Sequence, residues 1–82
     1  MNGTVTKELA LAAVRNRAHT TNEGRTVVHV LDSFAGADWD LSGVEDLIHR
    51  SVGIEYRPHA LRHDLVVRSC DGCAYSIDVP HP

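Results

Sequence analysis

An Asp71-Gly72 pair near the end of the chain constrains the fold most, because it separates two runs rich in strand-forming residues. A two-residue type I′ turn needs positive φ at both central positions, and Asp-Gly adopts this conformation readily. The register that follows has three facing pairs, namely Cys70 with Cys73, Arg68 with Tyr75, and Val66 with Ile77. Its mostly apolar face consists of Val66, Cys70, Cys73, Tyr75, Ile77 and Val79. The sequence therefore predicts a C-terminal β-hairpin.

The residues before this hairpin favour a short helix over 58–65. Proline fixes its own φ and lacks an N–H, so Pro58 suits the first turn of a helix. His59, Arg62 and His63 then recur at i, i+3 and i+4, which places them on one side of that helix. We therefore expect a helix with a polar, partly basic face that leads directly into the hairpin.

The segment 42–52 has the clearest helix signals in the chain. Ser42 and Glu45 have the spacing of a capping box, in which each side chain satisfies a backbone N–H at the start of a helix. Gly53 follows at the position where a glycine commonly ends a helix. The apolar stripe of this predicted helix is formed by Val44, Leu47, Ile48 and Val52.

Residues 4–19 are predicted to form an N-terminal helix. The segment is rich in good helix formers, and Thr4 or Thr6 can cap its start. Its apolar stripe is thin, which suits a helix at the edge of the domain or one that packs against a second copy of the chain.

Residues 26–34 fit two different structures. Their apolar residues recur at the spacing of a helix, at Val27, Val30, Leu31 and Phe34. The β-branched residues at the start of the segment suit a strand as well. We interpret the segment as a helix. A strand would instead give the order α-β-α-β-β, with a three-stranded sheet backed by two helices.

The length and composition of the chain suit one domain over residues 1–82. The chain has 82 residues, of which 43% are hydrophobic, and it carries a net charge of −3. No run approaches the ~20 apolar residues of a membrane span, and no secretory signal is recognisable at the N-terminus. We therefore expect a cytoplasmic protein with no membrane partner and with reduced cysteines.

The charges are unevenly distributed along the chain. Residues 23–48 contain one arginine and six carboxylates, whereas residues 49–68 contain four arginines and two carboxylates. The mildly basic region therefore coincides with the helix expected over 58–65.

The predicted order of elements over residues 25–79 resembles the winged helix-turn-helix of bacterial and phage regulators. Gly53-Ile54 followed by Ala60-Leu61-Arg62-His63-Asp64-Leu65 is similar to the glycine-hydrophobe turn and the T-V-R-R-D-L recognition helix of many repressors. The resemblance implies an α+β fold with three core helices and a C-terminal hairpin wing. The helix over 4–19 is an addition to that core.

The resemblance also implies binding to double-stranded DNA, with the helix at 58–65 in the major groove and the wing on the backbone or the minor groove. Carried over residue by residue, the groove-facing side chains are Arg57, His59, Arg62 and His63, and the wing contact is Arg68. We therefore expect a transcription regulator, dimeric through its N-terminal helix, that has no catalytic set and no cofactor.

Two alternatives stay open. Cys70 and Cys73 together with His59 and His63 have the ligand types of a structural zinc site, although two small hydrophobic cysteines give the same pattern. If residues 26–34 form a strand, the chain is a protein-interaction module, comparable with small phage-encoded inhibitors and adaptors. Its acidic residues over 23–48 would then face a basic partner.

Overall fold

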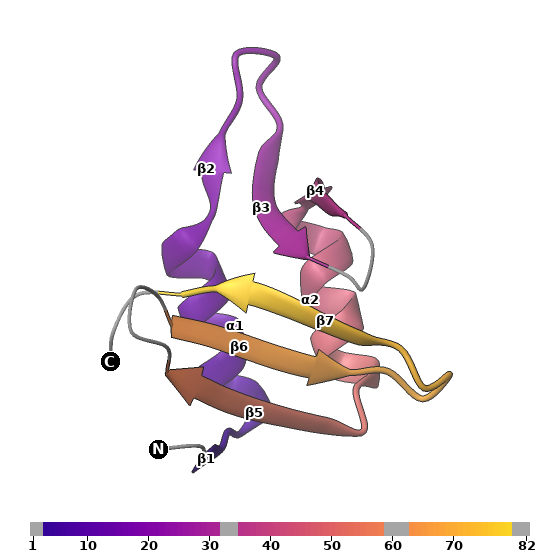
Figure 1. Ribbon diagram of the computed structural model, residues 1–82. Helices are drawn as coiled ribbons and strands as arrows, with labels where there is room; N and C mark the ends of the chain where they lie inside the picture. The colour runs from indigo at the N-terminus through magenta and orange to yellow at the C-terminus, as the bar shows by residue number, and fades with distance from the viewer. Residues whose placement is uncertain (1–2, 32–34, 59–62, 80–82) are drawn as a thin grey trace.

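The computed structural model describes residues 3–31, 35–58 and 63–79. These residues form two helices and seven strands, arranged as shown in Figure 1. The elements are β1 (Gly3–Thr4), α1 (Lys7–Arg17), β2 (His19–Thr20), β3 (Thr26–Leu31), β4 (Gly36–Asp40), α2 (Leu41–Arg50), β5 (Gly53–Pro58), β6 (His63–Arg68) and β7 (Ala74–Asp78). Neither helix of this described part is long and apolar enough to cross a membrane.

The sheet is antiparallel and divides at β3. Six strands follow the order β1-β5-β6-β7-β3-β2, and β4 pairs with β3 as well. Val30 and Leu31 pair with both β7 and β4, so these two neighbours lie on opposite edges of β3. Val27 pairs with both β2 and β4, which puts β2 on the same edge as β7. One edge of β3 is therefore shared by β7 and β2, and the other belongs to β4.

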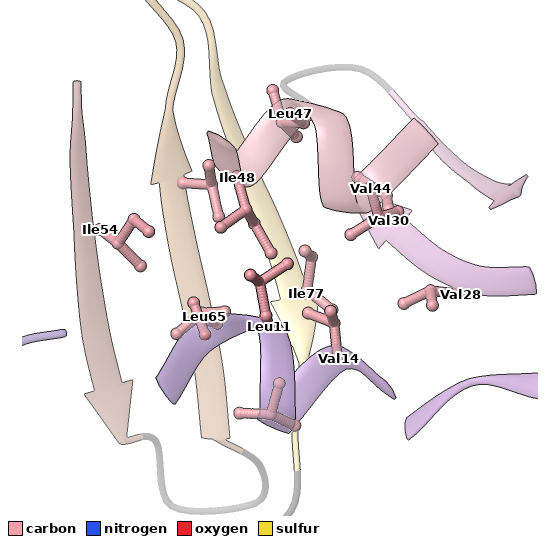
Figure 2. Close-up of a cluster of buried hydrophobic side chains, with 13 residues drawn as sticks. Leu11, Val14, Val28, Val30, Val44, Leu47, Ile48, Ile54, Leu65 and Ile77 are labelled. Atoms are coloured by element: carbon pink, nitrogen blue, oxygen red, sulfur yellow. The ribbon is translucent and has the colours of Figure 1, made fainter. Parts of the chain in front are cut away.

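Both helices lie behind β5, β6 and β7 in Figure 1 and cover one face of the sheet. Alternate strand residues point toward that face, and their apolar side chains meet those of α1 and α2 in Figure 2. The buried core comprises Ala10, Leu11, Val14, Val28, Val30, Val44, Leu47, Ile48, Ile54, Leu65, Val67, Ile77 and Val79. The opposite face carries no helix in the described part of the chain and is called the open face below.

The helix predicted over 4–19 is present as the shorter α1. Thr6 caps its start, because the Leu9 N–H donates to Thr6 Oγ1 at 3.2 Å. At the same end, Lys7 Nζ donates to the carbonyl oxygen of His49 at 2.6 Å. The start of α1 therefore lies beside the end of α2, and the two helices run antiparallel.

The helix predicted over 42–52 is present as α2, but without the expected capping box. The helix begins at Leu41, and Asp40 occupies the N-cap position with no side-chain cap bond. Glu45 instead pairs with Arg15 of α1 at 2.6 Å. An ion pair between the helices thus takes the carboxylate that the sequence pattern assigned to the local cap.

The end of α2 also differs from the prediction. Ser51 ends the helix, and its Oγ donates to the Ile48 carbonyl at 2.6 Å. Gly53 is the first residue of β5, not a helix C′ glycine. Val52 is 69% exposed and lies outside the apolar stripe, which consists of Val44, Leu47 and Ile48.

The predicted winged helix-turn-helix fold is wrong. Two of its three core helices are replaced by strands: β3 covers Thr26–Leu31, and Pro58 and His63–Leu65 lie in β5 and β6. The strand alternative for 26–34 is confirmed over Thr26–Leu31, and residues 32–34 lie outside the described residues. The fold is α+β, with an antiparallel sheet and only two helices in the described part.

Burial with a period of two explains why strands form where helices were expected. In the β5–β6 pair, Ile54 faces Val67 and Tyr56 faces Leu65, and all four side chains pack in or against the core. The helix over 58–65 was predicted from Pro58 and from polar residues at helical spacing. Placing polar residues on one side of a helix buries no apolar surface. Sheet pairing removes more apolar area from water, so it prevails.

The C-terminal hairpin is confirmed, but its turn is one residue longer than predicted. The Gly72 N–H donates to the Ser69 carbonyl at 3.1 Å, and the Ser69 N–H donates to the Cys73 carbonyl at 2.8 Å. Gly72 has a φ of 92°. This is a three-residue loop, a type I turn followed by a left-handed glycine, and not the two-residue type I′ turn.

The longer loop shifts the register of the hairpin by one residue. Arg68 faces Ala74 and Val67 faces Tyr75, so Val67 lies on the core face where the sequence placed Val66. The residues that β7 and Val79 turn toward the core were predicted correctly, because Tyr75, Ile77 and Val79 pack in or against it.

Candidate functional site

Of the five residues that were expected to contact DNA, only Arg57 and Arg68 have described side chains. Arg57 lies in β5 and Arg68 at the far end of β6, both at positions that alternate onto the open face. His63 begins β6, and its side chain lies outside the described residues, as do His59 and Arg62. No helix carries any of the described members of this set.

Among the possible zinc ligands, His63 lies apart from the two cysteines, and His59 lies outside the described residues. Cys70 and Cys73 are exposed, form no disulfide, and lie in the loop after β6. His63 is at the opposite end of that strand, and six strand residues span roughly 20 Å. Among the described residues, no group of three or more His, Cys, Asp or Glu is placed to hold a metal ion.

Ion pairs neutralise much of the charge on the described surface. Five arginines have a carboxylate partner within 3.1 Å, in the pairs Arg15–Glu45, Arg17–Asp78, Arg25–Asp40, Arg50–Asp46 and Arg57–Glu55. Exposed pairs of this kind contribute only about 0–1 kcal/mol each to stability. Their larger effect is on recognition, since neither a concentrated basic patch nor the expected acidic surface over 23–48 is left unpaired.

β4 forms an edge of the described sheet. It pairs with β3 along all five of its residues and with no other described strand. An edge strand presents unpaired backbone groups, and charged side chains normally discourage its pairing with another chain. Here Asp38 Oδ1 lies 3.1 Å from His29 Nδ1, and Asp40 Oδ1 lies 2.7 Å from Arg25 Nη2. The carboxylates of β4 are therefore held against their own sheet.

β4 makes two further interactions with its neighbours. Asp40 raises the pKa of Arg25 above its ordinary value, through a hydrogen bond and through its charge. On the helix-covered face, Trp39 packs edge-on against Tyr75, with 5.1 Å between the ring centroids. β4 thus contacts β3 and Tyr75, and no described strand pairs with its outer edge.

β2 and the adjoining part of β3 form a hairpin that projects from the body of the domain in Figure 1. This hairpin, residues 19–27, is called the arm. At its tip the Thr21 N–H donates to the Arg25 carbonyl at 2.7 Å, and Gly24 has a φ of 84°. The turn has the same three-residue form as the one before β7, and residues 22–26 are exposed to solvent.

A cavity lies at the base of the arm. β2 reaches β3 at Val27 and β7 pairs with it from Val30, so a gap remains between them on the shared edge. A cavity of about 390 Å³ is lined there by Arg17, His19, His29 and Asp78. We call this cavity the fork pocket. Arg17 Nη2 and Asp78 Oδ2 form an ion pair at 3.0 Å at its wall.

His29 connects the fork pocket with β4. Its Nδ1 contacts Asp38, and its Nε2 lies so close to Gly36 that a Cβ added there would be 2.6 Å away. A side chain at position 36 would therefore require the ring to shift. The imidazole thus contacts β4 while it also lines the pocket.

The fork pocket has no signal in the local sequence. Its residues come from four separate elements, α1, β2, β3 and β7, and no local spacing joins them. A correct strand assignment would have given part of the signal, because alternation then places His29 and Asp78 on the open face together.

The described residues thus define a small α+β domain that has two helices on one face of an antiparallel sheet and a projecting arm. Comparisons with protein families, with curated proteins and with solved structures find no match to this chain. Its function is therefore inferred from its own geometry.

Proposed function

We propose that this protein is a non-enzymatic protein-binding module that takes up an extended segment of a partner as an additional strand beside β4. The observation that carries the proposal is the ordered edge strand Gly36–Asp40, whose two carboxylates are bound by His29 and Arg25. Strand addition draws its affinity from main-chain hydrogen bonds and its specificity from alternate side chains.

The neighbouring arm extends the same surface. It projects beyond the body of the domain, so a segment seated along β4 continues past the edge of the sheet toward residues 22–26. The arm thus supplies contacts to side chains of the partner that main-chain pairing does not read. Together, β4 and the arm form the proposed binding surface.

Charge favours a protein partner over DNA. Strand positions on the open face carry four accessible carboxylates in the described residues, at Asp38, Asp40, Glu55 and Asp78, and a fifth, Asp64, that is buried. Four arginines accompany these carboxylates. Arg57 and Arg68 lie on the same strands, and Arg17 and Arg25 form ion pairs with Asp78 and Asp40. DNA affinity depends on lysines and arginines that neutralise phosphates, and this face offers no excess of them.

The test uses peptides selected from a random library displayed on phage, with proline variants of β4 as the comparison. In a strand, successive N–H groups point alternately toward the neighbouring strand and away from it. Ala37→Pro and Asp38→Pro therefore have different effects. One of the two removes an N–H that points away from β3, toward the proposed partner strand. The other removes a hydrogen bond to β3 and lowers stability. We expect the variant that keeps its thermal stability to lose the selected peptides.

Ala37→Ser is the matched control, because it changes the side chain and keeps the N–H. It should retain the peptides in full. Selected peptides that bind the stable proline variant as tightly as the wild type would contradict the proposal, and so would a library that yields no binding peptide.

A further inference from the structure

We infer that the fork pocket receives the guanidinium group of an arginine side chain from the partner protein. This inference rests on the proposed protein-binding function and names the chemistry of the partner. The fork pocket lies on the edge of β3 that is opposite to β4, so main-chain pairing with β4 does not occupy it.

The first argument is that Asp78 supplies a hydrogen-bond acceptor in the lining of the pocket. Its Oδ2 accepts from Arg17 Nη2 at 3.0 Å, whereas a carboxylate has sites for about four hydrogen bonds. Asp78 lines the cavity of about 390 Å³ together with two histidines, and this volume is within the range of small-ligand sites. An incoming guanidinium presents paired N–H donors in the geometry that suits a carboxylate.

The second argument is the shape of the lining groups. His19 and His29 contribute flat imidazole rings, and Arg17 contributes a flat guanidinium. A partner guanidinium is also planar and stacks on such faces, whereas the compact ammonium of lysine does not. His29 Nδ1 already contacts Asp38 Oδ1 at 3.1 Å, so one ring of the lining has a partner within the protein.

The third argument is that charge favours a cationic guest through the chain as a whole. The residues that line the pocket include one arginine and one carboxylate, Arg17 and Asp78, which pair with each other. The whole chain carries a net charge of −3, which favours a cationic group over a phosphate. A guanine base also has two adjacent N–H donors, so it serves as the competing ligand in the test.

The experiment is an NMR titration of the ¹⁵N-labelled protein with acetyl-Gly-Arg-Gly-amide. The comparison ligands are the same peptide with lysine, the same peptide with neutral citrulline, and guanosine. We expect the arginine peptide to shift the amide signals of His19, His29 and Asp78, and to bind more tightly than each comparison ligand. Absence of these shifts, equal binding of the lysine peptide, or preferential binding of guanosine would overturn the inference.

Variants assign the interaction to the pocket. Asp78→Asn should weaken the arginine peptide about tenfold or more, which is the effect of losing a hydrogen bond to a charged group. Asp46→Asn removes a carboxylate on α2 that pairs with Arg50 and should leave the affinity unchanged. Equal weakening by both would show an effect of net charge alone and overturn the inference. His19→Ala should weaken binding of the arginine peptide. His19→Phe should restore it, because phenylalanine again provides a planar ring for stacking.

The outcomes for the pocket and for β4 are separable. Selected peptides that require β4 but bind Asp78→Asn with full affinity would leave the protein-binding function standing and overturn the pocket inference. An arginine peptide that binds the pocket, together with selected peptides that ignore β4, would support an arginine site and refute strand addition.

Discussion

Replacement of Gly36 by alanine tests how closely β4 packs on the side chains of β3. A Cβ at this position would lie 2.6 Å from His29 Nε2, 2.8 Å from Leu31 Cδ2 and 2.9 Å from His29 Cε1. These separations are shorter than van der Waals contact, so the imidazole must move. Movement of the ring breaks its 3.1 Å contact with Asp38.

The expected cost follows from three contributions. A side chain forced off its rotamer costs about 0.5–1.5 kcal/mol, and loss of the exposed His29–Asp38 pair costs about 0.2–1 kcal/mol. Against these, alanine lowers the entropy of the unfolded chain, which stabilises the fold by about 0.4–1 kcal/mol. We therefore expect Gly36→Ala to lower the free energy of unfolding by about 1 kcal/mol.

The assay is urea denaturation of Gly36→Ala, His29→Ala and the double variant. Two of the three close contacts involve the imidazole, so His29→Ala should remove most of the cost, with a coupling energy of about 1 kcal/mol. Gly43→Ala is the matched control, because a Cβ there meets nothing within 4 Å and α2 should gain about 1 kcal/mol from it. A Gly36→Ala variant as stable as Gly43→Ala would refute the reasoning.

Three further predictions concern the core, the hairpin loop and metal binding. Ile77→Ala removes a fully buried core side chain and should cost about 2–5 kcal/mol in urea unfolding; a loss below 1 kcal/mol would contradict the packing. The pKa of Asp71 is lowered, mainly because its carboxylate accepts the backbone N–H of Cys73, so its contribution to stability is present above pH about 4 and is lost as the pH falls through the folded-state pKa. Between pH 6 and pH 2, the melting temperature of the wild type should therefore fall more steeply than that of Asp71→Asn. The asparagine keeps an acceptor oxygen but does not titrate. Equal dependence of the two melting temperatures on pH would contradict this prediction. EDTA should leave the melting temperature unchanged, because Cys70 and Cys73 form no site with other described ligands, and a lowered melting temperature would reveal a bound metal.

The sequence predicted those elements whose signals are local. The helices predicted over 4–19 and 42–52 are present as Lys7–Arg17 and Leu41–Arg50. The first is rich in good helix formers, and the second has an apolar stripe that packs in the core. The C-terminal hairpin is present because a glycine lies where the loop needs positive φ. Its register was missed because Asp-Gly fits both a two-residue and a three-residue loop, and the choice changes which residues reach the core.

The helices expected over 25–35 and 58–65 show the limit of local spacing. In β3, Val28 and Val30 face the core while His29 between them is exposed. This is the period of two of a strand. It is missed when apolar residues are counted at helical spacing. Burial by neighbours distant in the sequence decides between the two periods. The fork pocket was not predictable for the same reason, since it depends on which strands share an edge of β3.

The recurrence of one loop form at Thr21–Arg25 and Ser69–Cys73 is a feature that the sequence does contain. Both loops start with a hydroxyl residue and have glycine three positions later, at Gly24 and Gly72. In both, the N–H of the glycine bonds to the carbonyl of the hydroxyl residue. Once recognised, this spacing sets the register of the hairpins that form the arm and the end of the sheet.

The most direct test of the central claim is to record intermolecular nuclear Overhauser effects between a selected peptide and this protein. Strand addition predicts contacts between α-protons of the peptide and backbone protons along Gly36–Asp40, in the alternating pattern of an antiparallel or parallel ladder. Contacts restricted to the outer surface of α1 around Leu9, which is 63% exposed, would contradict the account and make that helix the binding surface.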